Sequence, residues 1–448
     1  MLNELALTCS SDGSYVWDFR AGTVVLSLRQ NNSSKHAVDL VPYSGHAGRV
    51  GLVMCAQSDR AIINVYSWQK EQVHMKILCP EKLTSLEISN RGAYCAGGTE
   101  NGKIYLWELF SGRLCAVFDA HYKKVNVLRF TSDDTVLISG SEDAGVNVWL
   151  MASLVDELTD DVPSPYYAWS EHSLPITDIV CGIGSFLTAR VLTSSVDHTC
   201  KLWNLSSGTL LTTFVFPTII TCLAMDPAER MFFAGGGDNT IYQVNLYRKG
   251  EERDIGDGGL VFRGHNAPLS TLSLSFDSSL LVSGSEDGCV NIWDTSSRQL
   301  VKRLAQHKGP ITNVQTFLKP PDLFKLSPYP TNTVIQPIQP FKKTKNIAQK
   351  DDDDYGAIVV IDGADDYDKI LDECHGRAVK SREHLNLVQV ENITTQLQMS
   401  DTTAALESKV NELQSELSRI HGHYQRVKSL HNEMYQNLVD EFMQSRNK

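Results

Sequence analysis

The chain has 448 residues, of which 42% are hydrophobic and 21% charged, so it is long enough for two or three ordinary domains or one large repeat domain and should fold over most of its length. We expect no signal peptide and no membrane span, because no basic segment precedes an apolar one at the start and no run of about 18 apolar residues occurs. Of the net charge of −12, the segment Asp351–Glu373 supplies −9 with ten acidic residues and one lysine, so the nearly neutral remainder does not indicate a nucleic-acid-binding surface.

The ten cysteines are scattered without a CxxC pair. This pattern indicates free thiols in a reducing compartment rather than a disulfide framework or a zinc site. The sequence accordingly predicts no metal and no cofactor. We expect several thiols to fill core positions as small apolar side chains, namely Cys55, Cys95, Cys115, Cys222 and Cys289.

Tryptophan recurs along the chain at intervals of 39 residues or more, with Val244 in its place in the sixth repeat. A period near 40 with insertions is typical of the four-stranded blade of a β-propeller, which takes roughly 40–45 residues. Seven repeats fit the usual range of about four to eight blades. The tryptophans that mark the repeats are Trp17, Trp68, Trp107, Trp149, Trp203 and Trp293.

Two nearly identical phrases, SGSEDAGVNVW at Ser139–Trp149 and SGSEDGCVNIWD at Ser283–Asp294, show what one repeat encodes. An apolar strand ends in small residues, an acidic turn follows, and an alternating strand completes a hairpin. An Asx residue suits such a turn because its side chain accepts backbone N–H groups. Six residues before the tryptophan or its substitute stand Asn101, Asp143, Asp197, Asp238 and Asp287.

A histidine stands 28 to 31 residues before three of the tryptophans. With this combination the chain resembles the WD-repeat family, in which a His, the turn Asp, a strand Ser or Thr and the Trp form a buried hydrogen-bond chain that we call a latch. A fully paired buried network stiffens the blade around it. The resemblance implies three latches: His121, Ser139, Asp143 and Trp149; His172, Thr193, Asp197 and Trp203; and His265, Ser283, Asp287 and Trp293.

A Ser, a His and an Asp in one unit also suit a hydrolase, but recurrence at blade spacing indicates a structural device. The repeats that end at Trp17 and Trp68 lack the histidine and the regular turn Asp, and the sixth repeat has lost its Trp. The first blade also lacks its innermost strand. We expect Pro310–Leu318 to supply that strand and to close the ring, which removes exposed strand edges.

The interval between Trp149 and Trp203 holds an insertion, LVDELTDDVPSPYYAWSEHSLPITDIVCGIGS. Together with SSVDHTCKLWNLSSG, GTENGKIYLWELFSGRL and a helical C-terminus, it makes residues 1–318 similar to the WD-repeat protein eighteen family. The resemblance implies a seven-bladed propeller subunit of the rixosome, a nuclear complex that helps mature the large ribosomal subunit and process the internal spacer of its precursor RNA. It implies protein subunits as partners, with the pre-60S particle and its AAA-type ATPase contacted indirectly. The implied location is the nucleolus and nucleoplasm, with the cytoplasm left open.

Residues 319–367 are predicted to be an extended, mobile linker that is proline-rich and then acidic. The stretch FKKTK at Phe341–Lys345 fits either a weak nuclear import signal or a solvated basic patch. Residues 357–361 form a short β-prone run that suits addition to a sheet edge. The surrounding carboxylates match no calcium loop.

Residues 368–448 are nearly free of Gly and Pro and carry a seam with alternating steps of four and three residues. This is the period of a coiled coil, so we predict a C-terminal helix that self-associates or pairs with another subunit. A helix packed on the side of the propeller is the alternative. The seam comprises Leu406, Val410, Leu413, Leu417, Ile420, Tyr424, Val427, Met434 and Leu438, with His431 as an imperfect member.

The favoured function is that of a non-catalytic scaffold. An enzyme is disfavoured because the chain has no phosphate loop, nucleophile elbow, HExxH or zinc spacing. Direct RNA binding is disfavoured because basic and aromatic residues are not interleaved. The remaining alternative is a peptide or modification reader, such as a substrate receptor in a ubiquitin ligase or a chromatin complex.

Overall fold

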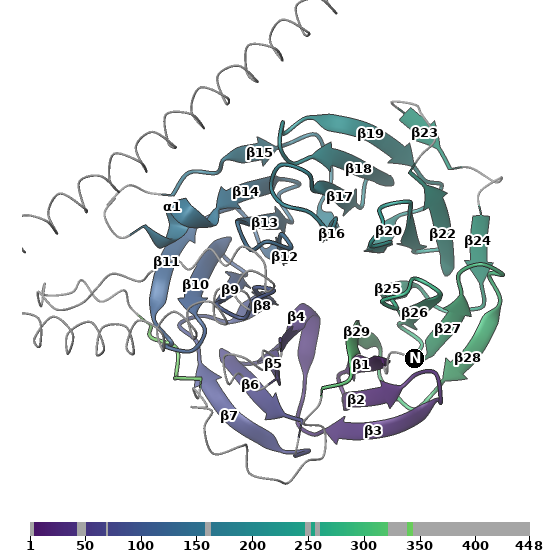
Figure 1. Ribbon diagram of the computed structural model, residues 1–448, viewed down its shortest axis with the longest axis horizontal. Coiled ribbons are helices and arrows are strands. Elements are labelled where there is room, and N and C mark those ends of the chain that lie inside the picture. The colour runs from purple at the N-terminus through teal and green to yellow at the C-terminus, as the bar shows by residue number, and fades with distance from the viewer. Residues whose placement is uncertain are drawn as a thin grey trace, which may run out of the picture. The chain divides into compact units, whose positions relative to one another are not determined.

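The computed structural model describes residues 4–42, 51–68, 70–156, 163–246, 252–255, 260–320 and 338–343. Seven sheets of these residues surround a central channel (Figure 1), which confirms the predicted all-β, seven-bladed propeller. The β-prone run at 357–361, the predicted coiled coil of 368–448 and its seam lie outside the described residues and remain predictions.

The blades are numbered along the chain, and the strands of each blade are given from the innermost strand, beside the channel, to the outermost strand. Blade 1 contains β29 (Ile311–Leu318), β1 (Glu4–Ser10), β2 (Gly13–Asp18) and β3 (Thr23–Leu28). Blade 2 contains β4 (Ser33–Val41), β5 (Leu52–Gln57), β6 (Ile62–Ser67) and β7 (Val73–Leu78). Blade 3 contains β8 (Leu83–Ile88), β9 (Tyr94–Thr99), β10 (Lys103–Glu108) and β11 (Leu114–Asp119). Blade 4 contains β12 (Val125–Phe130), β13 (Val136–Ser141), β14 (Val146–Leu150) and β15 (Tyr167–Trp169).

The remaining blades follow the same order. Blade 5 contains β16 (Ile176–Cys181), β17 (Arg190–Ser195), β18 (Thr199–Asn204) and β19 (Leu210–Val215), with β23 (Glu252–Asp254) added in parallel at its outer edge. Blade 6 contains β20 (Ile220–Met225), β21 (Met231–Gly236), β22 (Thr240–Asn245) and β24 (Leu260–Arg263). Blade 7 contains β25 (Leu269–Leu274), β26 (Leu280–Ser285), β27 (Val290–Asp294) and β28 (Leu300–Leu304).

Blade 1 closes the ring with strands from both ends of the propeller. β29 pairs with β1 in antiparallel register from Glu4↔Leu318 to Ser10↔Ile311. This confirms the prediction that the segment before Leu318 supplies the missing innermost strand. The pairing covers the inner edge of β1, which would otherwise be open for association with another chain.

The insertion between Trp149 and Trp203 forms two small elements. α1 (Met151–Val155) packs Met151 and Leu154 beside β11, and β15 then supplies the outer strand of blade 4. Among the described residues no helix is long and apolar enough to cross a membrane.

The hydrophobic core is divided into seven clusters, and each cluster joins two neighbouring blades. The reason is that a blade is a flat sheet whose two faces must both be covered, and the next blade on each side covers them. The five cysteines expected in the core are buried, which confirms that prediction. They are Cys55, Cys95, Cys115, Cys222 and Cys289.

The prediction of a mobile linker is wrong for residues 338–343, which lie against blade 3. Ile338 and Phe341 are 7% and 5% exposed, because both side chains enter the apolar cluster between blades 2 and 3. Of the FKKTK stretch, Phe341 is therefore buried, whereas Lys342 and Lys343 are exposed.

Candidate functional site

The polar residues predicted for blade 4 lie together inside that blade. The indole N–H of Trp149 donates to Ser139 Oγ at 3.0 Å, and the same oxygen lies 2.8 Å from His121 Nε2. His121 Nδ1 lies 3.2 Å from the carboxylate of Asp143, which also accepts two backbone N–H groups. Burial opposes ionisation of Asp143, but the hydrogen bonds from His121 and the backbone outweigh it and lower the pKa of this carboxyl to about 2.

Blade 5 has the same geometry with a threonine as the central hydroxyl. Trp203 donates to Thr193 Oγ1 at 3.0 Å, and His172 Nε2 lies 2.9 Å from that oxygen. His172 Nδ1 lies 3.0 Å from the carboxylate of Asp197. The two blades therefore share one arrangement that joins the loop before the blade, the turn and two strands.

Blade 7 departs from the predicted latch. Trp293 donates to Ser283 Oγ at 2.8 Å, and His265 Nε2 lies 2.6 Å from it. His265 Nδ1, however, is buried with no hydrogen-bond partner in the described chain, and the carboxylate of Asp287 lies 3.3 Å from the guanidinium of Arg303 instead. The predicted link between His265 and Asp287 is therefore wrong, because Arg303 on β28 competes for the carboxylate. Burial lowers the pKa of His265 to about 4 and keeps its ring neutral.

Blade 1 contains a latch that the sequence analysis missed. Trp17 donates to Thr8 Oγ1 at 2.9 Å, and His307 Nε2 lies 2.8 Å from the same oxygen. His307 Nδ1 lies 3.3 Å from Asp12. No latch was predicted at Trp17 because its histidine comes from the other end of the ring. The repeat at Trp68 does differ from the others, since its indole N–H has no partner among the described residues.

In all four latches the central hydroxyl is buried and already accepts an indole N–H. A nucleophilic hydroxyl must instead be open to substrate and activated by its base. The four sets lie in four different blades and do not converge on one cleft. These residues therefore connect the strands of each blade.

The channel wall carries a second set of polar residues that was not predicted. Every innermost strand has a β-bulge at its second residue, and a bulge redirects the side chain that it carries. Five of these side chains donate to a carbonyl of the next blade, as Thr84 does to Val125 O and Thr221 does to Leu269 O, both at 2.6 Å. The sequence signal is a Ser, Thr or Asn in second place on each strand: Ser34, Thr84, Asn126, Thr177, Thr221, Ser270 and Thr312.

The bulge of β4 is the largest and carries Lys35 and His36 across the channel. Lys35 Nζ donates to Thr221 O of blade 6, and His36 Nε2 lies 3.3 Å from Thr177 O of blade 5. The backbone of His36 has a φ of +56°, a left-handed conformation that a non-glycine residue adopts only when its surroundings impose it. We call the side of the ring where the innermost strands begin the N-side, and the side where they end the C-side. His36 lines one pocket on each of these two sides.

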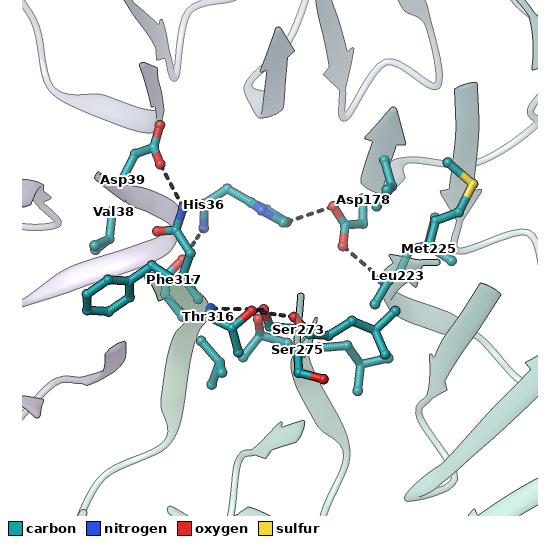
Figure 2. Close-up of a pocket in the computed structure, with 18 of the residues that line it drawn as sticks. His36, Val38, Asp39, Asp178, Leu223, Met225, Ser273, Ser275, Thr316 and Phe317 are labelled. Carbon is teal, nitrogen blue, oxygen red and sulfur yellow. Dashed lines mark hydrogen bonds and ion pairs between the residues drawn. The ribbon is translucent and has the colours of Figure 1, made fainter. Parts of the chain in front are cut away.

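The C-side pocket has a volume of about 400 Å³, and His36, Asp39 and Asp178 are among the residues that line it (Figure 2). Arg129 lies 2.7 Å from Glu87 and 3.8 Å from Asp178, and Asp39 adds a third carboxyl. Burial raises the pKa of Glu87 to about 8 and lowers that of His36 to about 3. Because His36 is neutral, Arg129 is the one cation among the residues that line this pocket. With a pKa of about 8 the carboxyl of Glu87 is mostly protonated near pH 7, and a further positive charge in the pocket would favour its ionised form.

Exposed apolar side chains follow the innermost strands on the C-side. They lie in the loops after β16 and β25 and at the end of β29, and two of them, Phe276 and Leu318, also line the C-side pocket. Exposed apolar groups that lie together are typical of interaction surfaces. The set, which we call the C-side rim, is Ile183, Leu187, Phe276 and Leu318, with exposed fractions of 66%, 73%, 64% and 47%. In the part of the chain that the structure describes, no three His, Cys, Asp or Glu side chains are arranged to hold a metal ion.

The comparisons with known proteins agree with this geometry. Residues 112–149, 208–244 and 259–294 match the family model for the WD domain, G-beta repeat. The latches and the seven-bladed ring together with these matches define the protein as a WD-repeat propeller.

Three similar proteins narrow the family. The chain is 38% identical over 311 residues to WD repeat-containing protein 18 of Homo sapiens, covering 68% of this chain and 70% of the relative. It is 34% identical to Protein ROOT INITIATION DEFECTIVE 3 of Arabidopsis thaliana over 71% and 73% of the two chains, and 33% identical to Pre-rRNA-processing protein IPI3 of Yarrowia lipolytica over 70% and 76%. The chain therefore belongs to the family of WD repeat-containing protein 18 and IPI3, which confirms the family inferred from the sequence.

Proposed function

We propose that the protein is a non-catalytic scaffold subunit of a nuclear complex that is needed for pre-60S maturation and for internal-spacer processing of the precursor ribosomal RNA. The main support for this proposal is the sequence similarity of the chain to proteins that are named as pre-rRNA-processing proteins. The proposal is consistent with latches whose central hydroxyls are already hydrogen-bonded inside the blades. It entails a nuclear and nucleolar location.

The C-side is the surface that we propose for a partner subunit. Exposed apolar side chains such as Leu187 and Phe276 can be covered by apolar residues of the partner, as in the centre of a typical protein interface. The carboxyls of Glu87 and Asp178 in the C-side pocket suit a Lys or Arg side chain from the same partner segment. A partner that combines an apolar stretch with a basic residue fits both features.

The C-terminal seam extends the scaffold. We propose that Leu406, Val410 and the residues that follow them in the seam pair with a second copy or with another subunit. Through such subunits the complex would contact the pre-60S particle and its AAA-type ATPase indirectly. The nearly neutral propeller supplies no direct nucleic-acid site to this proposal.

A peptide or modification reader is the second candidate function. The observation that favours it is the position of His36, which lines both pockets in the channel and reaches Thr177 O of blade 5. The C-side pocket, with a volume of about 400 Å³, is large enough for a side chain of a bound peptide. The three carboxyls around Arg129 favour a ligand with a basic group over a phosphorylated one. This candidate shares the C-side with the scaffold proposal but needs no ribosomal partner.

Depletion and rescue test the scaffold proposal. Depletion of the protein should accumulate unprocessed precursor of the large-subunit RNA, and wild-type protein should restore processing. The C-side variant Phe276→Glu should fail to restore it, whereas Val301→Glu, which changes an exposed apolar residue on the outer strand β28, should succeed. A normal RNA profile after depletion would contradict the proposal and favour the reader.

A further inference from the structure

Blade 3 has a tryptophan but no latch of its own. Ten residues before Trp149, Trp203 and Trp293 stands a hydroxyl residue that accepts the indole N–H, but ten residues before Trp107 stands Gly97. A Cβ at Gly97 would lie 3.0 Å from the Trp107 ring, so the indole occupies the space that a serine would need. Trp107 is fully buried, and a buried N–H requires an acceptor from elsewhere.

That acceptor comes from a segment 235 residues further along the chain. Trp107 Nε1 donates to the carbonyl oxygen of Lys342 at 3.1 Å. The ring of Phe341 stacks on the Trp107 ring at a centroid distance of 4.9 Å and an interplanar angle of 18°. Ile338 fills a neighbouring position in the apolar cluster of blades 2 and 3. The segment thus accepts the hydrogen bond of the Trp107 indole N–H and also covers the face of the Trp107 ring.

The backbone of the segment is also paired, and its partners lie in the turn between β10 and β11. Gln339 donates its N–H to Phe110 O at 3.1 Å, and Lys342 donates its N–H to Gly112 O at 2.8 Å. Gly112 has a φ of +64°, and a Cβ there would lie 2.4 Å from the carbonyl oxygen of Pro340. Only glycine allows this close approach, so the turn is shaped for the segment that covers it.

We propose that residues 338–343 are a docking motif that fills a groove between blades 2 and 3 and supplies the acceptor for the Trp107 indole that blade 3 itself lacks, and that the groove recognises the pattern Ile-x-Pro-Phe. Docking fixes the point from which the C-terminal region leaves the propeller. Undocking exposes an apolar groove and an unpaired indole to a competing segment of the same pattern. The inference rests on the contacts of blade 3 and holds whether or not the protein acts on ribosomal RNA.

Peptide binding to the full-length chain tests this proposal. The receptor carries Ile338→Ala and Phe341→Ala, which leave the groove intact but remove its own occupant, and the probe is a fluorescent peptide of residues 335–345. The probe should bind this variant at least tenfold more tightly than it binds the wild-type chain, whose groove is filled. A peptide with Phe341→Ala should bind neither receptor. A folded variant that binds both peptides equally, or neither, would overturn the proposal.

Hydrogen exchange on single-glycine variants supplies a second test that does not need the receptor variant. Gly112→Ala should release the segment, so the amides of Gln339 and Lys342 should exchange at least tenfold faster than in the wild-type chain. Gly92→Ala is the matched control, because its φ of +66° gives a similar backbone strain and the atoms nearest to its Cβ belong to the side chains of Pro42 and Val41 and not to residues 338–343. Equal exchange at Gln339 in the two variants would refute docking through the β10–β11 turn.

Discussion

The central hydroxyl of a latch should carry a large part of its stabilising effect, and Ser139 in blade 4 allows this to be measured. Ser139 is completely buried, and its oxygen faces the indole N–H of Trp149 and the Nε2 atom of His121, which are themselves 2% and 8% exposed as residues. Ser139→Ala leaves both ring nitrogens without that oxygen. Since each of the two buried unpaired polar groups costs about 1–3 kcal/mol, we expect the free energy of unfolding to fall by about 2–6 kcal/mol.

Urea unfolding followed by tryptophan fluorescence measures this loss. Ser139→Thr should recover most of the stability, because blade 5 uses Thr193 in the same place with the same distances. Ser207→Ala, which removes an exposed hydroxyl, should change the unfolding midpoint very little. If Ser139→Ala were no more destabilising than Ser207→Ala, the reasoning on buried pairing in the latches would be refuted.

Three further outcomes follow from the same structure. His307→Ala should lower stability and speed hydrogen exchange in β1 and β29, since His307 links the two ends of the ring; unchanged exchange there would count against a closing latch. The pKa of Glu87 is raised to about 8, so the folded state holds this proton more tightly than the unfolded state does. The free energy of unfolding should therefore fall as the pH rises from about 4.3 to 8. Urea titrations at several pH values should show this slope in the wild-type chain and a flatter one in Glu87→Gln. Light scattering of the full-length chain and of a chain that ends near Arg377 should show the mass dropping to one copy, and equal masses would exclude assembly through the C-terminal seam.

Much of the ring could be predicted from sequence because most residues that interact within a blade also lie close together in the sequence. In blade 4 and blade 5 the strand hydroxyl, the turn Asp and the Trp lie within one repeat, so their spacing brings them into one hairpin. Asp143 and Asp197 keep their histidines, and the described strands β15 and β19, which pair with β14 and β18, carry no Lys or Arg that could compete for these carboxylates. In blade 7 such a cation exists. Arg303 stands on β28 opposite Asn291, and the repeat spacing contains no information about which partner Asp287 prefers.

Two other features were missed because their partners are distant in sequence. His307 completes the latch of Trp17, which stands 290 positions earlier in the sequence. This pairing can be predicted only if the last repeat is treated as the neighbour of the first. Residues 338–343 have the composition of a linker, with one proline and no strand pattern. They hold a defined position because they contact Gly112 and Trp107, which lie in blade 3 and are distant in sequence. Composition describes what a segment does when alone and cannot reveal a groove that the rest of the chain forms.

The distribution of latches indicates where the ring is weakest. Blades 4 and 5 hold complete latches within themselves, whereas blade 1 depends on His307 and blade 3 on the carbonyl of Lys342. Blade 2 lies between these two, and the indole N–H of its Trp68 has no partner in the described residues. Contacts that join distant parts of the chain are lost together when either part moves, so local unfolding should begin in blades 1 to 3. Blade 1 also lacks a histidine in its own repeat, because a blade whose histidine comes from the other end of the ring is not required to encode one itself.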